Sequence, residues 1–273
     1  MKNTIIFLAL VLLIGQACDD SNPVIPVDNN FVYPLKIGNK WKFTASTVFS
    51  NIRPDSLKGS LANYSLNLQV SVTRDTLLNS ILTSEMKEER EDCPDCYAYY
   101  ANKENGLIEY AYQGGGLALP KTNNIKRFLY KGNYFNSITE FIKKQEEIIR
   151  VSKTMDDSLI YIDPPRIIYA YPLEIGKEWI FNSMFRINKE AIAKEKVKTK
   201  AGVFQCYKIQ IKYDLDTDGV WDDDFIYYEY VSSKGLLKSE ITIKNVVLTN
   251  IENPEGIGYV DVKEERVLVN VNF

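Results

Sequence analysis

The chain has 273 residues, of which 45% are hydrophobic and 12% aromatic, enough apolar material for one large domain or two small ones. Its 33 basic and 36 acidic residues give a net charge of −3, and no basic cluster appears, which argues against nucleic acid as a partner. The sequence contains no histidine, which excludes histidine-based catalytic triads, histidine general bases and histidine zinc sites.

The N-terminus has the features of an export signal. Lys2 precedes an apolar run over residues 5–14, which is too short to span a bilayer, and the small residues Gly15 and Ala17 precede Cys18. This segment resembles a bacterial lipoprotein signal peptide with a lipobox. In that family the cysteine is acylated and becomes the first residue of the mature chain. The alternative is an ordinary secretory signal with an incidental cysteine.

The resemblance divides the chain into a signal peptide over residues 1–17, a lipidated tether over residues 18–30 and a single β-rich domain over residues 31–273. Because residues 1–17 contain one charged side chain, their removal changes the net charge from −3 to −4. The tether is polar and contains proline, so it buries little. Its acidic start, Asp19-Asp20, resembles the surface-export signals of some Gram-negative envelopes. We therefore expect an outer-membrane lipoprotein that is exposed at the cell surface.

One phrase occurs twice in the predicted domain, at residues 33–43 and 171–181. Tyrosine, proline, leucine, isoleucine, glycine, tryptophan and phenylalanine recur in register. The glycine favours a tight turn, and Trp-x-Phe places two rings on one face of the strand that follows. We expect Trp41 and Trp179 to be structural anchors buried in one core. Paired tryptophan platforms for a flat ligand or a sugar are the alternative.

The repeat predicts that the domain consists of two related halves, residues 31–165 and 166–273. Alternating apolar and polar residues over 64–73 predict a half-buried antiparallel strand. Asn105-Gly106, between two aromatic runs, predicts a β-hairpin.

A helix is predicted over residues 137–150, where Ser137 and Glu140 form a capping-box pattern. Residues 190–199 are ambiguous, because their composition favours helix while their position before a strand favours β-structure. From residue 202 onwards, alternating patterns predict several further strands.

Three cysteines follow the tether. Cys93 and Cys96 form Cys-x-x-Cys, which outside the cytoplasm can close as a disulfide or take part in redox exchange. The acidic residues before the motif disfavour a reactive thiolate, so we expect a structural disulfide, with Cys206 left as a thiol. Cys206 is in phase with Lys208 and Gln210, so it need not lie in the core.

An aspartate-rich run lies between two predicted strands, and it matches D-x-D-x-D-G-x-x-D. Hard cations such as Ca²⁺ prefer carboxylate and carbonyl oxygens in this type of loop. The predicted ligands are the carboxylates of Asp214, Asp216, Asp218 and Asp222 and the carbonyl of Val220, with Gly219 at the turn. The run is similar to calcium loops in the β-hairpins of adhesion-receptor propellers. It is not a complete EF-hand loop, because Phe225 occupies the twelfth position. A solvated acidic turn is the alternative.

The repeated Tyr-Pro-Leu-x-Ile-Gly-x-x-Trp motif, the run over residues 201–206 and Gly235-Leu236-Leu237-Lys238 together resemble a broad set of uncharacterised envelope lipoproteins. Their domain is similar to lipoprotein-carrier half-barrel folds. The resemblance implies a mainly β (α+β) fold, in which a curved antiparallel sheet with a minor helix wraps an apolar hollow. It implies no catalytic residue.

Two functions remain open at this stage. The first is a membrane-anchored binding or structural module for an apolar ligand or a partner protein, with a calcium-stabilised hairpin. The second is a carboxylate-dependent enzyme such as a glycosidase, for which the many acidic residues supply no specific pair. The sequence favours the first.

Overall fold

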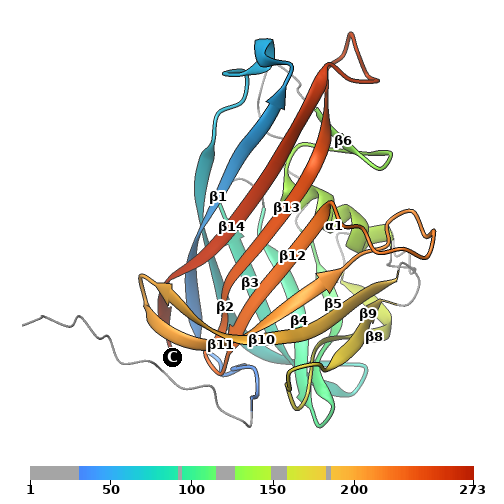
Figure 1. Ribbon diagram of the computed structural model, residues 1–273. Helices are drawn as coiled ribbons and strands as arrows, with labels where there is room; N and C mark the ends of the chain where they lie inside the picture. The colour runs from blue at the N-terminus through green and yellow to red at the C-terminus, as the bar shows by residue number, and fades with distance from the viewer. Residues whose placement is uncertain (1–30, 92–93, 115–126, 149–158, 183–185) are drawn as a thin grey trace, which may run out of the picture.

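The computed structural model describes residues 31–91, 94–114, 127–148, 159–182 and 186–273 (Figure 1). Cys18, Cys93 and the segments expected to be the signal peptide and the tether lie outside the described residues. The described chain forms one antiparallel sheet of 14 strands, with a single α-helix and a short 3-10 turn. No helix of this part of the chain is long and apolar enough to cross a membrane.

The strands belong to two groups in chain order. The first group is β1 (Lys40–Arg53), β2 (Tyr64–Leu78), β3 (Ile81–Arg90), β4 (Cys96–Lys103), β5 (Gly106–Gln113), β6 (Arg127–Tyr130), β7 (Asn133–Phe135) and β8 (Ile160–Ala170). The second group is β9 (Glu178–Asn182), β10 (Ile187–Thr199), β11 (Gly202–Lys212), β12 (Phe225–Ser232), β13 (Gly235–Thr249) and β14 (Gly258–Asn272). The 3-10 turn is η1 (Asp55–Leu57), and the helix is α1 (Ile138–Ile148).

The sheet consists of two meanders joined edge to edge. Its order is β8-β5-β4-β3-β2-β1-β14-β13-β12-β11-β10-β9, and the β6–β7 hairpin is attached to β13. A long ladder between β1 and β14 joins the meanders. The two outer strands, β8 and β9, lie next to each other without a shared ladder, so the sheet curls almost to closure (Figure 1). This confirms the expected mainly β, half-barrel architecture with a minor helix.

The repeated phrase builds the same turn at the start of each meander. In each copy the turn glycine donates to a neighbouring strand, β2 or β10, and that strand donates back to the residue after the glycine. The two sets are Gly38 with Val72 and Asn39, and Gly176 with Ala191 and Lys177. The glycines have φ of +94° and +83°, a region that favours glycine. The predicted boundary at residues 165 and 166 falls inside β8.

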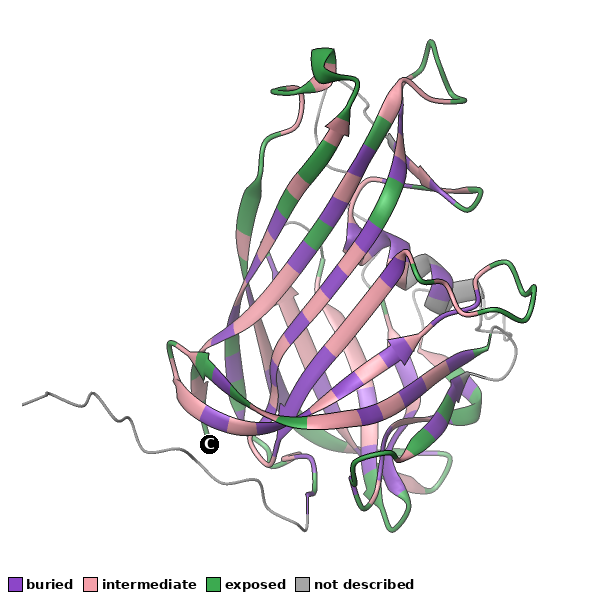
Figure 2. Cartoon of the chain, in the orientation of Figure 1, coloured by how far each residue is buried: buried purple, intermediate pink, exposed green. Residues whose placement is uncertain are grey.

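Buried residues recur along the strands of the sheet (Figure 2), and most of them belong to two apolar clusters. Trp41 and Trp179 are both buried and belong to one apolar cluster. A second cluster includes Ile138 and Phe141 of α1, which pack against strands of the second meander. The Ser137 hydroxyl accepts a hydrogen bond from the backbone N–H of Glu140 at 3.1 Å, as the predicted cap requires.

The structure gives a position to two features that the sequence left undecided, residues 190–199 and Cys206. The ambiguous stretch 190–199 lies within β10, so its position in the sheet overrides its helical composition. Cys206, whose position the strand phase left open, is buried in the core. Both faces of β11 are covered at this point, because Phe204 and Cys206 on one face and Tyr207 on the other all belong to the first apolar cluster.

Candidate functional site

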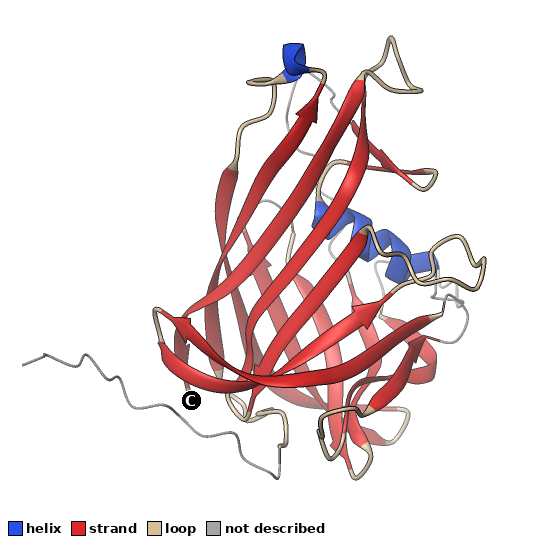
Figure 3. Ribbon diagram, viewed as in Figure 1, coloured by secondary structure: helices blue, strands red, loops and turns tan. Residues whose placement is uncertain are grey.

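The aspartate-rich run forms the connection between β11 and β12, residues 213–224 (Figure 3). Tyr213 and Phe225, at the two ends of this connection, are buried and make an edge-to-face ring contact with centroids 4.5 Å apart. The backbone N–H of Asp222 donates to the carbonyl of Tyr213 at 2.8 Å. The base of the loop is therefore fixed to the core, which positions the carboxylates beyond it.

Three of the predicted ligands converge. One carboxylate oxygen from each of Asp214, Asp216 and Asp218 lies within 4.8 Å of the others. Asp214 is fully buried, whereas Asp216 and Asp218 are exposed. The site therefore has one carboxylate at its base and two at its mouth, open to solvent.

Backbone N–H groups shape the loop around Asp214. The two carboxylate oxygens of Asp214 accept hydrogen bonds from the N–H groups of Asp218 at 3.1 Å and Gly219 at 3.0 Å. The Asp218 carboxylate accepts one from the N–H of Val220 at 2.8 Å. Thr217 has φ of +58° and Gly219 has φ of +93°, so two left-handed residues close the turn. Backbone N–H groups of the loop therefore hold the carboxylates of Asp214 and Asp218 in place.

Two cations contact these carboxylates. The Arg186 guanidinium donates to Asp214 at 2.8 Å and stacks over the Trp221 ring at 5.1 Å. The Lys131 ammonium, in the turn of the β6–β7 hairpin, donates to Asp216 at 2.8 Å and also to Asp222. Its hydrogen bond to Asp216 lowers the pKa of that carboxyl below its ordinary value.

Asp222 takes a different position from the other predicted ligands. Its side chain is nearly inaccessible, and besides Lys131 it accepts a hydrogen bond from the backbone N–H of Leu215 at 2.9 Å. It lies outside the cluster of three carboxylates. Lys131 and Arg186 could not be predicted as part of this site, because nothing in their local sequence context links them to the aspartate run.

Buried charges also line the interior of the sheet. Arg166 of β8 donates to Glu109 of β5 at 3.1 Å, and Lys189 of β10 donates to Glu229 of β12 at 3.1 Å. Both cations lie over the ring of Phe181, at 4.9 and 4.7 Å from its centroid. Glu109 and Glu229 are thus each neutralised by a cation, as a buried charge requires.

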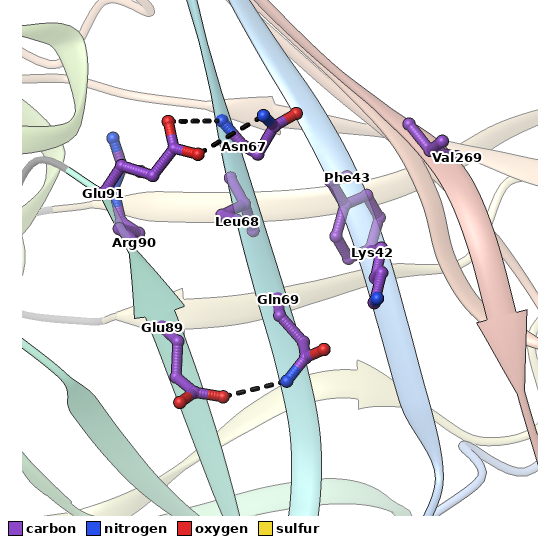
Figure 4. A pocket seen from close by; sticks show the side chains of 9 residues that line it. All are labelled: Lys42, Phe43, Asn67, Leu68, Gln69, Glu89, Arg90, Glu91 and Val269. Carbon is purple, nitrogen blue, oxygen red and sulfur yellow. Dashed lines mark hydrogen bonds between the residues drawn. The ribbon is translucent and has the colours of Figure 1, made fainter.

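An open depression of about 510 Å³ lies on β1, β2 and β3 (Figure 4). On its polar rim, Gln69 donates to Glu89 at 2.9 Å, and Asn67 donates to Glu91 through its backbone and side chain. Its lining includes no residue predicted from the sequence to form a site.

Of the four cysteines, Cys96 and Cys206 lie within the described residues. Because Cys93 is outside the described residues, the Cys93–Cys96 disulfide stays a prediction. Cys206 is a buried thiol, and burial raises its pKa to about 12. The thiol therefore stays protonated at neutral pH.

Comparison with solved structures finds two chains with a low level of similarity to this one. No family model and no curated protein matches the chain. A protein from Bacteroides fragilis, described as exported with a YmcC-like fold, is 14% identical, with 89% of this chain and 100% of that chain covered and a TM-score of 0.37. A protein from Parabacteroides distasonis, described as a lipoprotein, is also 14% identical, with 90% and 100% covered and a TM-score of 0.33. Likeness at this level identifies neither a ligand nor an activity.

Proposed function

We propose that this chain is an acylated cell-envelope lipoprotein that serves as a binding or structural module, and that residues 214–222 bind Ca²⁺. The observation that carries the calcium assignment is the convergence of the Asp214, Asp216 and Asp218 carboxylates within 4.8 Å of one another. The ion would hold the β11–β12 connection in shape. We assign the ion a structural role, because Tyr213 and Phe225 fix the two ends of the loop in the core.

The ligand chemistry suits Ca²⁺ better than softer metals. Ca²⁺ takes about six to eight oxygen ligands, whereas zinc prefers nitrogen and sulfur. Asp214, Asp216 and Asp218 supply oxygen at the first, third and fifth positions of the loop, and the carbonyl of Val220 follows at the seventh. The two exposed carboxylates at the mouth leave an approach for a hydrated ion.

Lys131 and Arg186 determine how tightly the ion binds. Both place positive charge on carboxylates that Ca²⁺ requires. The ion must therefore displace or share these contacts, which lowers its affinity relative to an unpaired loop. Removing the ammonium in Lys131→Met should raise the affinity, while Asp216→Asn should lower it.

Calorimetric titration with Ca²⁺, together with melting temperature, tests this. Saturation at one hundred times the dissociation constant should stabilise the protein by about 2.7 kcal/mol. Asp55→Asn is the matched control, because Asp55 is an exposed aspartate in η1. Absence of both heat and a melting shift at millimolar Ca²⁺, in wild type and Lys131→Met alike, would make the run an ordinary acidic turn.

The module itself has two candidate ligands, an apolar molecule or a partner protein. The first apolar cluster is filled by the chain's own aromatic residues, including Trp41, Tyr169 and Tyr207. This supports a partner on the outside over an apolar molecule within. The glycosidase alternative has less support, because Glu109 and Glu229 are each engaged by a cation. Mass spectrometry of small molecules that copurify with the chain separates these cases: a stoichiometric apolar molecule would favour the interior.

A further inference from the structure

The strand directions separate the turns of the sheet into two ends (Figure 1). β1 starts at Lys40, and its antiparallel neighbours alternate in direction from there. One end, here called the tether end, contains the first described residues, the C-terminus and a set of short turns. These are residues 31–39, 79–80, 104–105, 171–177, 200–201, 233–234 and 273.

The chain enters the tether end at a fixed point. Phe31 is buried and makes edge-to-face contacts with the rings of Tyr169 and Tyr171, at 6.1 and 5.6 Å. The backbone N–H of Tyr33 donates to the Tyr171 hydroxyl at 2.9 Å, so the two copies of the repeated phrase meet here. The segment from Cys18 to Phe31 spans at most about 45 Å when fully extended. A tether of that reach keeps this end near the lipid but leaves the domain free to turn.

Charge is distributed unequally between the ends. The tether end carries four exposed lysines that form no ion pair with another described residue, Lys36, Lys40, Lys103 and Lys200. Glu104 and Glu174 are exposed among them and leave a basic excess. The opposite end carries exposed carboxylates, Asp216, Asp218, Glu252 and Glu255. Because the whole chain is negatively charged, an anionic surface would repel it in most orientations and attract it in one.

Two isoleucines project from the same end. Ile37 is 52% exposed and Ile175 is 60% exposed, and they occupy the same position in the two copies of the phrase. In the same copies, Leu35 and Leu173 pack against the core. Neither isoleucine belongs to an apolar cluster of the described chain. A single exposed isoleucine is ordinary, but two at equivalent turn tips, at the end that carries the four lysines, form a surface suited to the boundary between headgroups and acyl chains.

We infer that the tether end is a docking surface for an anionic lipid bilayer, in which the lysines contact headgroups and Ile37 and Ile175 enter the interface. This inference rests on the proposed acylation of Cys18, and it adds the orientation of the domain. The opposite end, which contains the aspartate-rich run, then points away from the membrane.

Fluorescence quenching in vesicles tests the orientation on the full acylated chain. The vesicles contain phosphatidylglycerol with brominated acyl chains, and Ile37→Trp and Ile175→Trp place a reporter at the tether end. Ile251→Trp is the matched control, because Ile251 is 77% exposed at the opposite end. After subtraction of the wild-type signal, quenching at residues 37 and 175 should exceed quenching at residue 251 at least twofold. Equal quenching at both ends overturns the inference.

The contribution of charge has its own comparison. The triple variant Lys36→Gln, Lys40→Gln, Lys103→Gln should lose most of the difference in quenching between the two ends. The chain with its lysines unaltered should lose the same difference when the vesicles contain brominated phosphatidylcholine in place of phosphatidylglycerol. Vesicle flotation and the intact mass of the chain separate the two proposals. An acylated chain that floats with the vesicles but shows equal quenching at both ends supports the proposed anchor and contradicts the proposed orientation. A chain without acyl groups contradicts the proposed anchor, and absence of quenching at both ends then contradicts the orientation as well.

Discussion

Trp41 and Trp179 occupy equivalent positions in the two copies of the phrase but differ in hydrogen bonding. The Trp41 indole donates to the backbone carbonyl of Lys234 at 2.6 Å. The buried indole nitrogen of Trp179 has no acceptor among the described residues. The substitutions Trp41→Phe and Trp179→Phe therefore remove rings of the same size from the same cluster, and differ in the polar group that is left behind.

This difference in hydrogen bonding determines how far the unfolding free energies of the two variants should differ. Loss of ring volume destabilises both variants similarly. Trp41→Phe also leaves the Lys234 carbonyl without its indole donor, which costs about 1–3 kcal/mol. Trp179→Phe removes a buried donor that had no partner, which offsets part of its cavity cost. Trp41→Phe should therefore lower the free energy of unfolding by at least about 1–3 kcal/mol more than Trp179→Phe.

Equilibrium unfolding in urea, followed by far-ultraviolet circular dichroism, measures the two free energies. An unchanged denaturant slope in both variants would show that the comparison concerns the same transition. The corresponding melting temperatures should differ by about 2–4 °C per kcal/mol. Equal free energies for the two variants, or a greater loss in Trp179→Phe, would refute the reasoning.

Two further predictions follow from the side-chain environments. Thiol titration of the unfolded, unlipidated chain should count one thiol, Cys206. This thiol should not react in the folded protein, because it is buried and its pKa is about 12. A count of three thiols in the unfolded chain would contradict the Cys93–Cys96 disulfide. The lowered pKa of Asp216 stabilises the fold above the unfolded-state value of about 3.9, and this stabilisation is lost as pH falls through the folded-state pKa. Wild type should therefore lose more stability than Asp216→Asn between pH 6 and pH 2, roughly the range over which an aspartate titrates, as measured by urea unfolding; parallel losses would exclude the Lys131 contact.

Local signals in the sequence predicted the parts of the fold that local chemistry determines. The repeated glycine and tryptophan predicted the turn and the buried anchor in each copy, because few other residues tolerate a positive φ or fill so large a volume. The Ser137–Glu140 pair predicted the start of α1 for the same reason. Composition could not resolve residues 190–199, since pairing with β11 decides their conformation.

Contacts between residues that are far apart in the sequence could not be predicted from local patterns. Lys131 and Arg186 reach the aspartate run from distant segments, and their sequence context has no feature that points to it. Cys206 follows the pattern of a solvent-facing residue, yet the curl of the sheet covers both faces of β11. Both cases depend on which strands meet, which periodicity alone does not specify.

The intact mass of the mature chain, expressed in a bacterial envelope and extracted with detergent, tests the proposed lipoprotein most directly. We expect a chain that begins at Cys18, lacks residues 1–17 and carries acyl groups on Cys18, with Cys18→Ala failing to partition into detergent. A soluble chain with an unmodified Cys18, or a mature N-terminus downstream of it, would show that the protein is not a lipoprotein anchored at Cys18.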